Sequence, residues 1–189
     1  CYLLTLTGLM RSEHSRHSGK WLLLSLLACQ TGVYCKEVII TAPVAALFMD
    51  RLWLAGSFTS ALQKRRGFYA GLFSSWIPLF ILRHYIETTV VTQASTGFAY
   101  QGIHPLQYAL SQFGVILHYI KLTLLPLHQC LDYQWQPVSS FRDALLPGMV
   151  IFSMAGVCLW AYIRRYFWGY WGCWFFFILA PTSSFVPLA

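Results

Sequence analysis

Charged residues are scarce in this sequence, and acidic residues are the scarcest of them. Only 10% of the 189 residues are charged, with 13 Lys and Arg against 6 Asp and Glu. A soluble domain carries about 25%, so the polar surface here is too small to cover an ordinary water-soluble globule. Hydrophobic residues make up 57% of the chain and the mean hydropathy is +0.55, which excludes a disordered chain as well. The composition therefore predicts an integral membrane protein or a part of one.

Several motifs that carry chemistry in other proteins are also missing. The chain has no Asn, so it has no N-glycosylation sequon, and none of its six cysteines forms a CxxC pair. A disulfide framework and a zinc site are therefore not expected. The sequence contains no GxxxxGK[ST] loop, GxSxG elbow or HExxH, so ATP-driven transport and serine hydrolysis find no support. The net charge of +7 lies between apolar runs, without a basic stripe with interleaved aromatics, which argues against nucleic acid as a partner.

Apolar runs separated by short charged segments predict an all-α, polytopic membrane protein. The predicted spans are 1–10, 21–35, 38–49, 67–82, 106–127, 144–163 and 166–181. The mixed segment 83–105 and the polar segment 128–143 are predicted as loops on the outer face. The first begins directly after a span, and the second separates two apolar runs.

Basic residues predict the orientation of these spans, because Lys and Arg are enriched in cytoplasmic loops. The basic segments are 11–20, 50–66 and 164–165. They share the cytoplasmic side if residues 21–49 form a hairpin with Lys36 and Glu37 at its outer tip. Both ends of 106–127 then lie outside, so that run is re-entrant or interfacial, or one assignment is wrong.

Lys36 and Glu37 are the most informative charged pair, because they stand between two apolar runs where charge is costly and is often functional. In one interpretation Lys36 holds a phosphate of a lipid-linked substrate and Glu37 orients it. In the other, both residues form the solvated tip of a hairpin. Asp50 and Arg51 are adjacent and so do not face each other on a helix; they are expected to form a charge cluster at a loop edge.

Asp132, Tyr133 and Trp135 are the second group of candidate binding residues. An acid beside aromatic rings suits carbohydrate, since sugar faces stack on rings and carboxylates bind hydroxyls. An aromatic anchor at the membrane interface is the alternative interpretation. After the last span, Pro181 ends the helix, and the hydroxyls that follow it are expected to cap backbone groups.

A set of short motifs in fixed order connects these segments. They are Cys35-Lys36-Glu37, Ala42-Pro43 and Asp50-Arg51, followed by residues 52–58, 112–119, 131–137 and 174–187. In order and spacing they resemble the multi-pass membrane part of bacterial tetratricopeptide-repeat proteins related to the transmembrane and tetratricopeptide-repeat O-mannosyltransferases. Those enzymes belong to the GT-C superfamily of glycosyltransferases. The similarity runs from about residue 21 to the end of the chain.

The resemblance implies a partial GT-C-like bundle that uses a polyprenyl-phosphate sugar as donor and a protein Ser or Thr as acceptor. The transferred hexose would be mannose, and the site would lie on the outer face of the bacterial inner membrane. The resemblance places Lys36 and Glu37 near the donor phosphate, with Asp132, Tyr133 and Trp135 as further substrate-binding candidates. No cofactor is expected in this segment; a divalent cation is compatible with the chemistry, but the sequence does not support one.

The sequence also departs from the family pattern. The acidic catalytic motif of the first outer loop is not present in it, so the catalytic residues are unknown and the general base is expected in a missing N-terminal part. No 34-residue period marks the tetratricopeptide repeats that follow in the family. We therefore expect this fragment alone to be inactive. A membrane anchor for a tetratricopeptide-repeat scaffold without catalysis is the alternative, and a transporter or lipid flippase is a third reading that only weak helix breaks support.

Overall fold

The described part of the chain is all-helical, which confirms the all-α part of the predicted fold class. The structure is a computed structural model, and it describes residues 1–89, 105–127, 130, 138 and 140–181. Within these residues there is no β-strand. The elements are α1 (Tyr2–His14), α2 (Ser18–Gly32), the 3₁₀ helix η1 (Glu37–Thr41), α3 (Ala42–Trp53), α4 (Phe58–Lys64), α5 (Arg66–Phe73), α6 (Trp76–Thr89), α7 (Pro105–Leu124), α8 (Phe141–Ile163) and α9 (Phe167–Leu179).

Proline and serine mark several helix ends. Pro43 stands in the first turn of α3, where its missing N–H costs nothing. The Ser57 hydroxyl accepts a hydrogen bond from the Ser60 amide at the start of α4, and the Ser140 hydroxyl accepts one from the Arg142 amide at the start of α8. These local signals fix where the helices begin.

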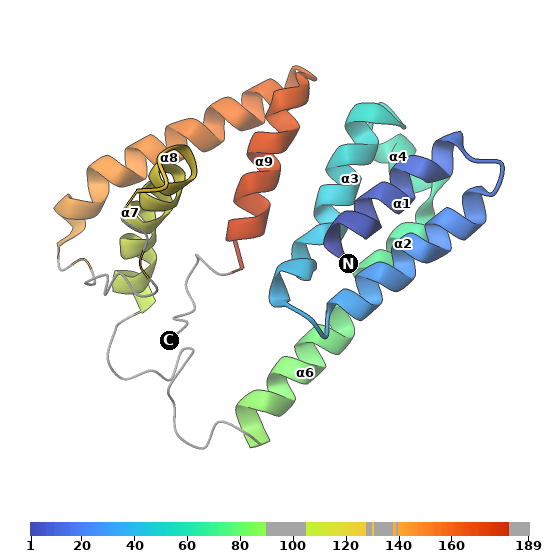
Figure 1. Ribbon diagram of the computed structural model, residues 1–189, viewed down its shortest axis with the longest axis horizontal. Helices are drawn as coiled ribbons and strands as arrows, with labels where there is room; N and C mark the ends of the chain where they lie inside the picture. The colour runs from blue at the N-terminus through green and yellow to red at the C-terminus, as the bar shows by residue number, and fades with distance from the viewer. Residues whose placement is uncertain (90–104, 128–129, 131–137, 139, 182–189) are drawn as a thin grey trace.

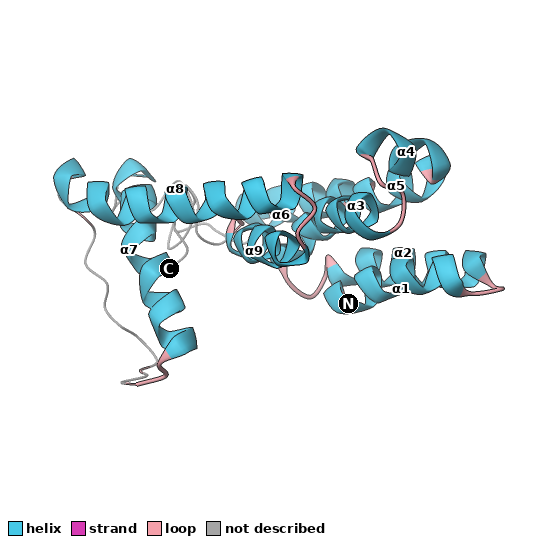
Figure 2. Ribbon diagram, turned by 90° about the horizontal axis from the view of Figure 1, so that it is seen from above, coloured by secondary structure: helices cyan, strands magenta, loops and turns pink. Residues whose placement is uncertain are grey.

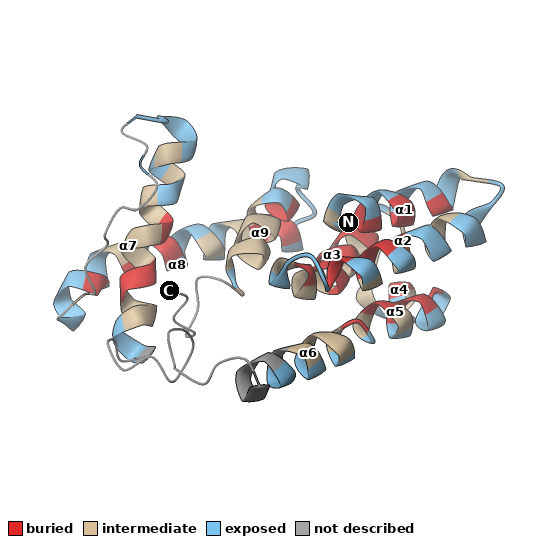
Figure 3. Cartoon of the chain, turned by 60° about the horizontal axis from the view of Figure 1, so that its bottom comes forward, coloured by how far each residue is buried: buried red, intermediate tan, exposed pale blue. Residues whose placement is uncertain are grey.

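The helices form two parts that α9 connects (Figure 1). In the first part, α1 and α2 form an antiparallel hairpin that packs on α3, with α5 against α2. Buried positions gather where α1, α2 and α3 face one another (Figure 3). Ala42, Ala45 and Ala46 are fully buried on α3, and these small side chains let its neighbours approach closely. In the second part, α8 and α9 pack against each other near the turn that joins them, and α7 crosses α8 and projects away from the other helices (Figure 2).

Few of these helices could cross a bilayer by length and composition. Among the described residues, α8 alone is long and apolar enough, with 23 residues and a mean hydropathy of 1.9 in its best window. The segment Glu37–Trp53 qualifies together with Phe58–Lys64, but the two are bent by 108° at the break between them. Helix α9 is apolar but shorter.

Several predicted boundaries differ from the structure. The segment 83–105, predicted as a loop, begins inside α6, which continues to Thr89. The predicted span 67–82 is split by a turn at Ser74 and Ser75, whose hydroxyls donate to the carbonyls of Gly71 and Leu72. The predicted polar loop 50–66 instead contains the end of α3 and the whole of α4. Hydropathy missed this because Asp50 and Arg65, which lower the mean hydropathy of the stretch, pair with each other inside the fold.

Candidate functional site

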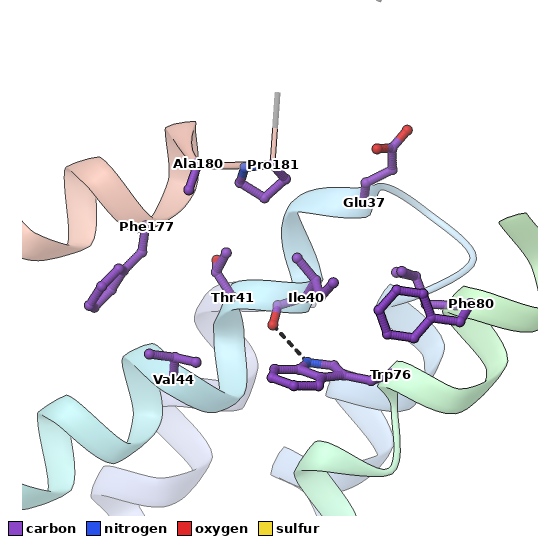
Figure 4. A pocket seen from close by; sticks show the side chains of 10 residues that line it. Glu37, Ile40, Thr41, Val44, Trp76, Phe80, Phe177, Ala180 and Pro181 are labelled. Atoms are coloured by element: carbon purple, nitrogen blue, oxygen red, sulfur yellow. Dashed lines mark hydrogen bonds between the residues drawn. The ribbon is translucent and has the colours of Figure 1, made fainter. Parts of the chain in front are cut away.

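An apolar cavity lies between η1, α3, α6 and α9, with a volume of about 390 Å³ (Figure 4). Most of its lining is aliphatic or aromatic. The lining residues are Glu37, Ile40, Thr41, Val44, Trp76, Leu79, Phe80, Phe177, Ala180 and Pro181. Segments almost 150 residues apart in the sequence therefore meet around one cavity.

Hydrogen bonds hold the walls of the cavity in place. The Trp76 Nε1–H donates to the Ile40 carbonyl at 2.9 Å, which ties α6 to η1 (Figure 4). The Thr41 hydroxyl donates to the Val38 carbonyl at 2.9 Å and also lies 3.0 Å from the Tyr2 hydroxyl. Because these polar groups are satisfied by the protein, the cavity offers a ligand mainly apolar contact.

Glu37 provides the charge at this cavity. It begins η1, and its carboxylate lies at the mouth and points away from the apolar lining (Figure 4). Lys36 precedes it in extended backbone, with φ −162° and ψ 142°, and is exposed to solvent without lining the cavity. The mouth therefore carries one carboxylate, with an ammonium group on the adjacent residue.

The structure brings together two of the motifs singled out in the sequence. Glu37, from the Cys35-Lys36-Glu37 motif, and Pro181, from the motif at 174–187, line the same cavity. The predicted binding residues Asp132, Tyr133 and Trp135 lie outside the described residues.

A buried ion cluster at the opposite end of α3 was missed by the sequence analysis. Asp50 is 0% exposed, so the predicted charge cluster at a loop edge is wrong for this residue. Its carboxylate accepts hydrogen bonds from Arg65 Nη1 at 2.8 and 2.9 Å and from the Tyr69 hydroxyl at 2.6 Å. Arg65 and Tyr69 are four residues apart, which is the spacing of one helix face and the signal that could have pointed to this pair.

The cluster extends to α1 through Glu13. The Glu13 carboxylate accepts hydrogen bonds from Lys64 Nζ at 3.0 Å and from Arg65 Nη2. The hydrogen bond from Lys64 and the charge of Arg65 hold the pKa of Glu13 below its ordinary value, against the opposing effect of desolvation. Arg65 thus joins two carboxylates from different helices.

Arg51 points away from this cluster, as expected for a residue adjacent to Asp50 on a helix. Its guanidinium lies 5.0 Å from the ring centroid of Phe58 and 4.7 Å from that of Tyr162. Such contacts are attractive because the ring face carries partial negative charge. The side chain therefore fastens α8 to the corner between α3 and α4.

No protein-family model matches this chain, and neither a curated protein nor a solved structure matches it. Within the described residues, no group of three or more His, Cys, Asp and Glu side chains is placed to hold a metal ion. The chemistry of the cavity therefore has to follow from its own lining: an apolar wall, one carboxylate at the mouth and a neighbouring lysine.

Proposed function

We propose that this chain is part of a polytopic membrane glycosyltransferase. The enzyme would move a hexose, with mannose as the favoured sugar, from a polyprenyl-phosphate donor to a protein Ser or Thr. The observation that carries the proposal is the apolar cavity with Glu37 at its mouth. Part of its lining, Glu37 from one side and Phe177, Ala180 and Pro181 from the other, belongs to the motifs that resemble the GT-C membrane enzymes. The protein would lie in the bacterial inner membrane.

The cavity suits part of a polyprenyl chain. Ile40, Val44, Phe80 and Phe177 supply an apolar lining, and the volume falls within the range of about 300–1,000 Å³ typical of small-molecule sites. An isoprenoid tail brings no hydrogen-bonding groups, and the polar groups of the wall already have partners within the protein. Burial of the tail in the cavity therefore leaves no polar group without a hydrogen bond. The charged head of the donor would then remain at the mouth.

At the mouth, Lys36 and Glu37 would act on the two ends of the donor head. The Lys36 ammonium would offset negative charge that develops on the leaving phosphate during displacement. Glu37 would accept hydrogen bonds from sugar hydroxyls. The acceptor hydroxyl must lose a proton, and the group that takes it is expected outside this segment.

Exposed apolar side chains support the membrane location. On α8, Leu146, Phe152 and Ile163 are 68%, 67% and 58% exposed, and Phe167 at the start of α9 is 66% exposed. Apolar patches of this kind are rare on soluble monomers and mark surfaces that meet lipid or another protein.

Photo-crosslinking tests the donor site. The chain would be placed in lipid nanodiscs with a polyprenyl phosphate that carries a diazirine in its isoprenoid tail. We expect labelled residues to gather at the cavity, and Val44→Trp, which fills it, should lower that labelling by about tenfold, the effect of losing 1.4 kcal/mol. Leu146→Trp, on the exposed face of α8, is the matched control and should leave cavity labelling unchanged.

A second variant separates the phosphate from the tail. Lys36→Gln should weaken labelling by polyprenyl phosphate but leave labelling by the uncharged polyprenol unchanged, because only the phosphate meets the ammonium. Labelling spread evenly along α8 and α9, without competition by unlabelled polyprenyl phosphate, would contradict the donor site. That result would favour the membrane anchor of a scaffold protein.

A further inference from the structure

The net charge of the chain is concentrated on one edge of the fold, here called the basic edge: residues 11–20, 50–66 and 164–165. These segments hold nine of the 13 Lys and Arg and two of the 6 Asp and Glu, so they carry the whole net charge of +7. In Figure 1 they form the α1–α2 loop, the corner from α3 to α5 and the α8–α9 turn, which follow one another along the upper side.

Direct contacts join the three segments into one surface. Arg65 binds Glu13 and so links the α4–α5 junction to the end of α1. Arg165 Nη2 donates to the Gly56 carbonyl at 2.6 Å and links the α8–α9 turn to the α3–α4 loop. Arg165 also adopts the left-handed conformation, with φ 65°, which a non-glycine residue rarely takes.

The carboxylates of the basic edge do not neutralise its outer surface. Asp50 is fully buried on Arg65, and Glu13 is bound by Lys64 and Arg65. Arg16, Lys20 and Arg66 are exposed, and none of the salt bridges among the described residues involves them. These exposed cations therefore face solvent, and no carboxylate of the described side chains forms a salt bridge with them.

Aromatic side chains accompany two other cations of the basic edge and indicate the kind of partner. Arg11 lies 5.1 Å from the ring centroid of Trp21, and Arg164 lies 6.0 Å from that of Trp160. Trp160 and Tyr166 are about half exposed, at 52% and 50%. Indole and phenol rings gather at the headgroup level of bilayers. Exposed apolar residues continue beyond them, such as Leu23 at 59%, which suits lipid better than a polar macromolecule.

We propose that the basic edge binds the phosphate groups of anionic phospholipids. Arg16, Lys20 and Arg66 supply free donors and positive charge at the depth where the aromatic rings place the headgroups. Uncompensated cations beside a bilayer attract anionic lipid because the phosphate replaces the carboxylate that the protein lacks there. This inference rests on the proposed membrane location and is independent of sugar transfer.

Spin-labelled lipids test the inference. The full chain would be reconstituted in phosphatidylcholine vesicles with a trace of spin-labelled phosphatidylglycerol or phosphatidylcholine, and the motionally restricted fraction of each label would be measured. We expect a preference for phosphatidylglycerol that Arg16→Gln/Lys20→Gln lowers by up to about fivefold for each of the two charges removed, the effect of about 1 kcal/mol per charge. Lys121→Gln/Arg142→Gln removes the same charge from exposed sites off the basic edge and should keep the preference.

Each outcome of this experiment supports or overturns the binding of anionic phospholipid by the basic edge. A preference that is lost with the first variant, kept with the second and weakened by salt supports the inference, since a Debye length of ~10 Å at 0.1 M shortens further as salt rises. Equal restriction of both lipids, or equal loss in both variants, overturns the inference but leaves the membrane location standing. Failure of the chain to enter vesicles overturns both, and circular dichroism of each variant confirms that it is folded.

Discussion

At the scale of single residues, Asp50 holds the corner between α3 and α5 together. Its carboxylate is 0% exposed, and the Arg65 side chain that neutralises it is 6% exposed. Burying a lone charge is costly, so each partner depends on the other. The Tyr69 hydroxyl adds a short hydrogen bond of 2.6 Å to the same carboxylate. The cluster therefore acts as a structural fastening of three helices.

Removing the buried carboxylate should destabilise the fold strongly. Asp50→Ala leaves the buried Arg65 with Glu13 as its one remaining charged partner among the described residues, and breaking a buried pair costs about 3–5 kcal/mol. Asp143→Ala is the matched control: Asp143 is exposed in the first turn of α8, where losing its interaction with the helix dipole costs about 0.5 kcal/mol. Unfolding in mixed micelles, followed by circular dichroism, measures both. Equal losses in the two variants would show that the Asp50 pair contributes no special stability.

The same residues show the limit of sequence reasoning at this scale. That Asp50 and Arg51 would not face each other followed from helix geometry, and the structure confirms it. The burial of Asp50 could not be predicted in the same way. Its partner Arg65 lies outside its own helix, and a stretch rich in charge has the low hydropathy that is typical of a loop. Pairing between helices depends on their packing, which one sequence does not display.

At the scale of helices, glycine sets how closely α8 and α9 approach. A Cβ added at Gly169 would lie 2.3 Å from the Tyr162 amide nitrogen and 2.6 Å from the Ala161 carbonyl carbon. Both are backbone atoms, which cannot move aside as the end of a flexible side chain can. The tight turn between the two helices therefore requires the absence of a side chain at this position.

Gly169→Ala should accordingly disrupt the α8–α9 pair. The overlap forces a backbone shift that typically costs about 1–3 kcal/mol. Gly156→Ala, in α8, is the matched control because nothing lies within 4 Å of its added Cβ. It should be neutral or should stabilise the helix by up to about 1 kcal/mol. The midpoint of thermal unfolding measures both changes; a Gly169→Ala midpoint equal to that of Gly156→Ala would mean that the two helices can move apart freely.

Helices of uniform composition were predicted well, and interrupted ones were not. The apolar runs 144–163 and 166–181 correspond to α8 and α9 within a few residues. The run 67–82 has equally apolar residues, yet Ser74 and Ser75 bond to preceding carbonyls and break it into α5 and α6. A pair of serines inside an apolar run is compatible with either outcome, because the same hydroxyls also fit within a continuous helix.

At the scale of the whole molecule, the cavity and the basic edge lie at opposite ends of α2 and α3. Glu37 follows the end of α2, whereas Lys20 lies near its start, and Asp50 near the end of α3. The prediction that the basic segments share one side agrees with this arrangement, which gathers them along one edge (Figure 1). The convergence of Glu37 with Pro181 could not be derived from the sequence, since it depends on how α9 returns to α3.

This polarity predicts that the two ends of α2 lie on opposite faces of a membrane. Cys35 is exposed beside Glu37, and Ser18→Cys would place a thiol on the basic edge. In a background with Cys1→Ser and Cys130→Ser, a membrane-impermeant maleimide added to intact cells should label Cys35. The thiol at position 18 should react only after the membrane is opened.

The result is informative because α2 is short. Its 15 residues span about 22 Å, which is less than the ~30 Å thickness of the hydrocarbon core. Either the bilayer is thinned locally where α2 crosses it, or α2 does not cross the bilayer. Labelling on opposite faces would show that the hairpin crosses and would place the cavity of Glu37 on the outer side, where a lipid-linked donor is expected. Labelling of both thiols from the same face would make 21–49 a re-entrant element and would move the cavity to the side of the basic edge.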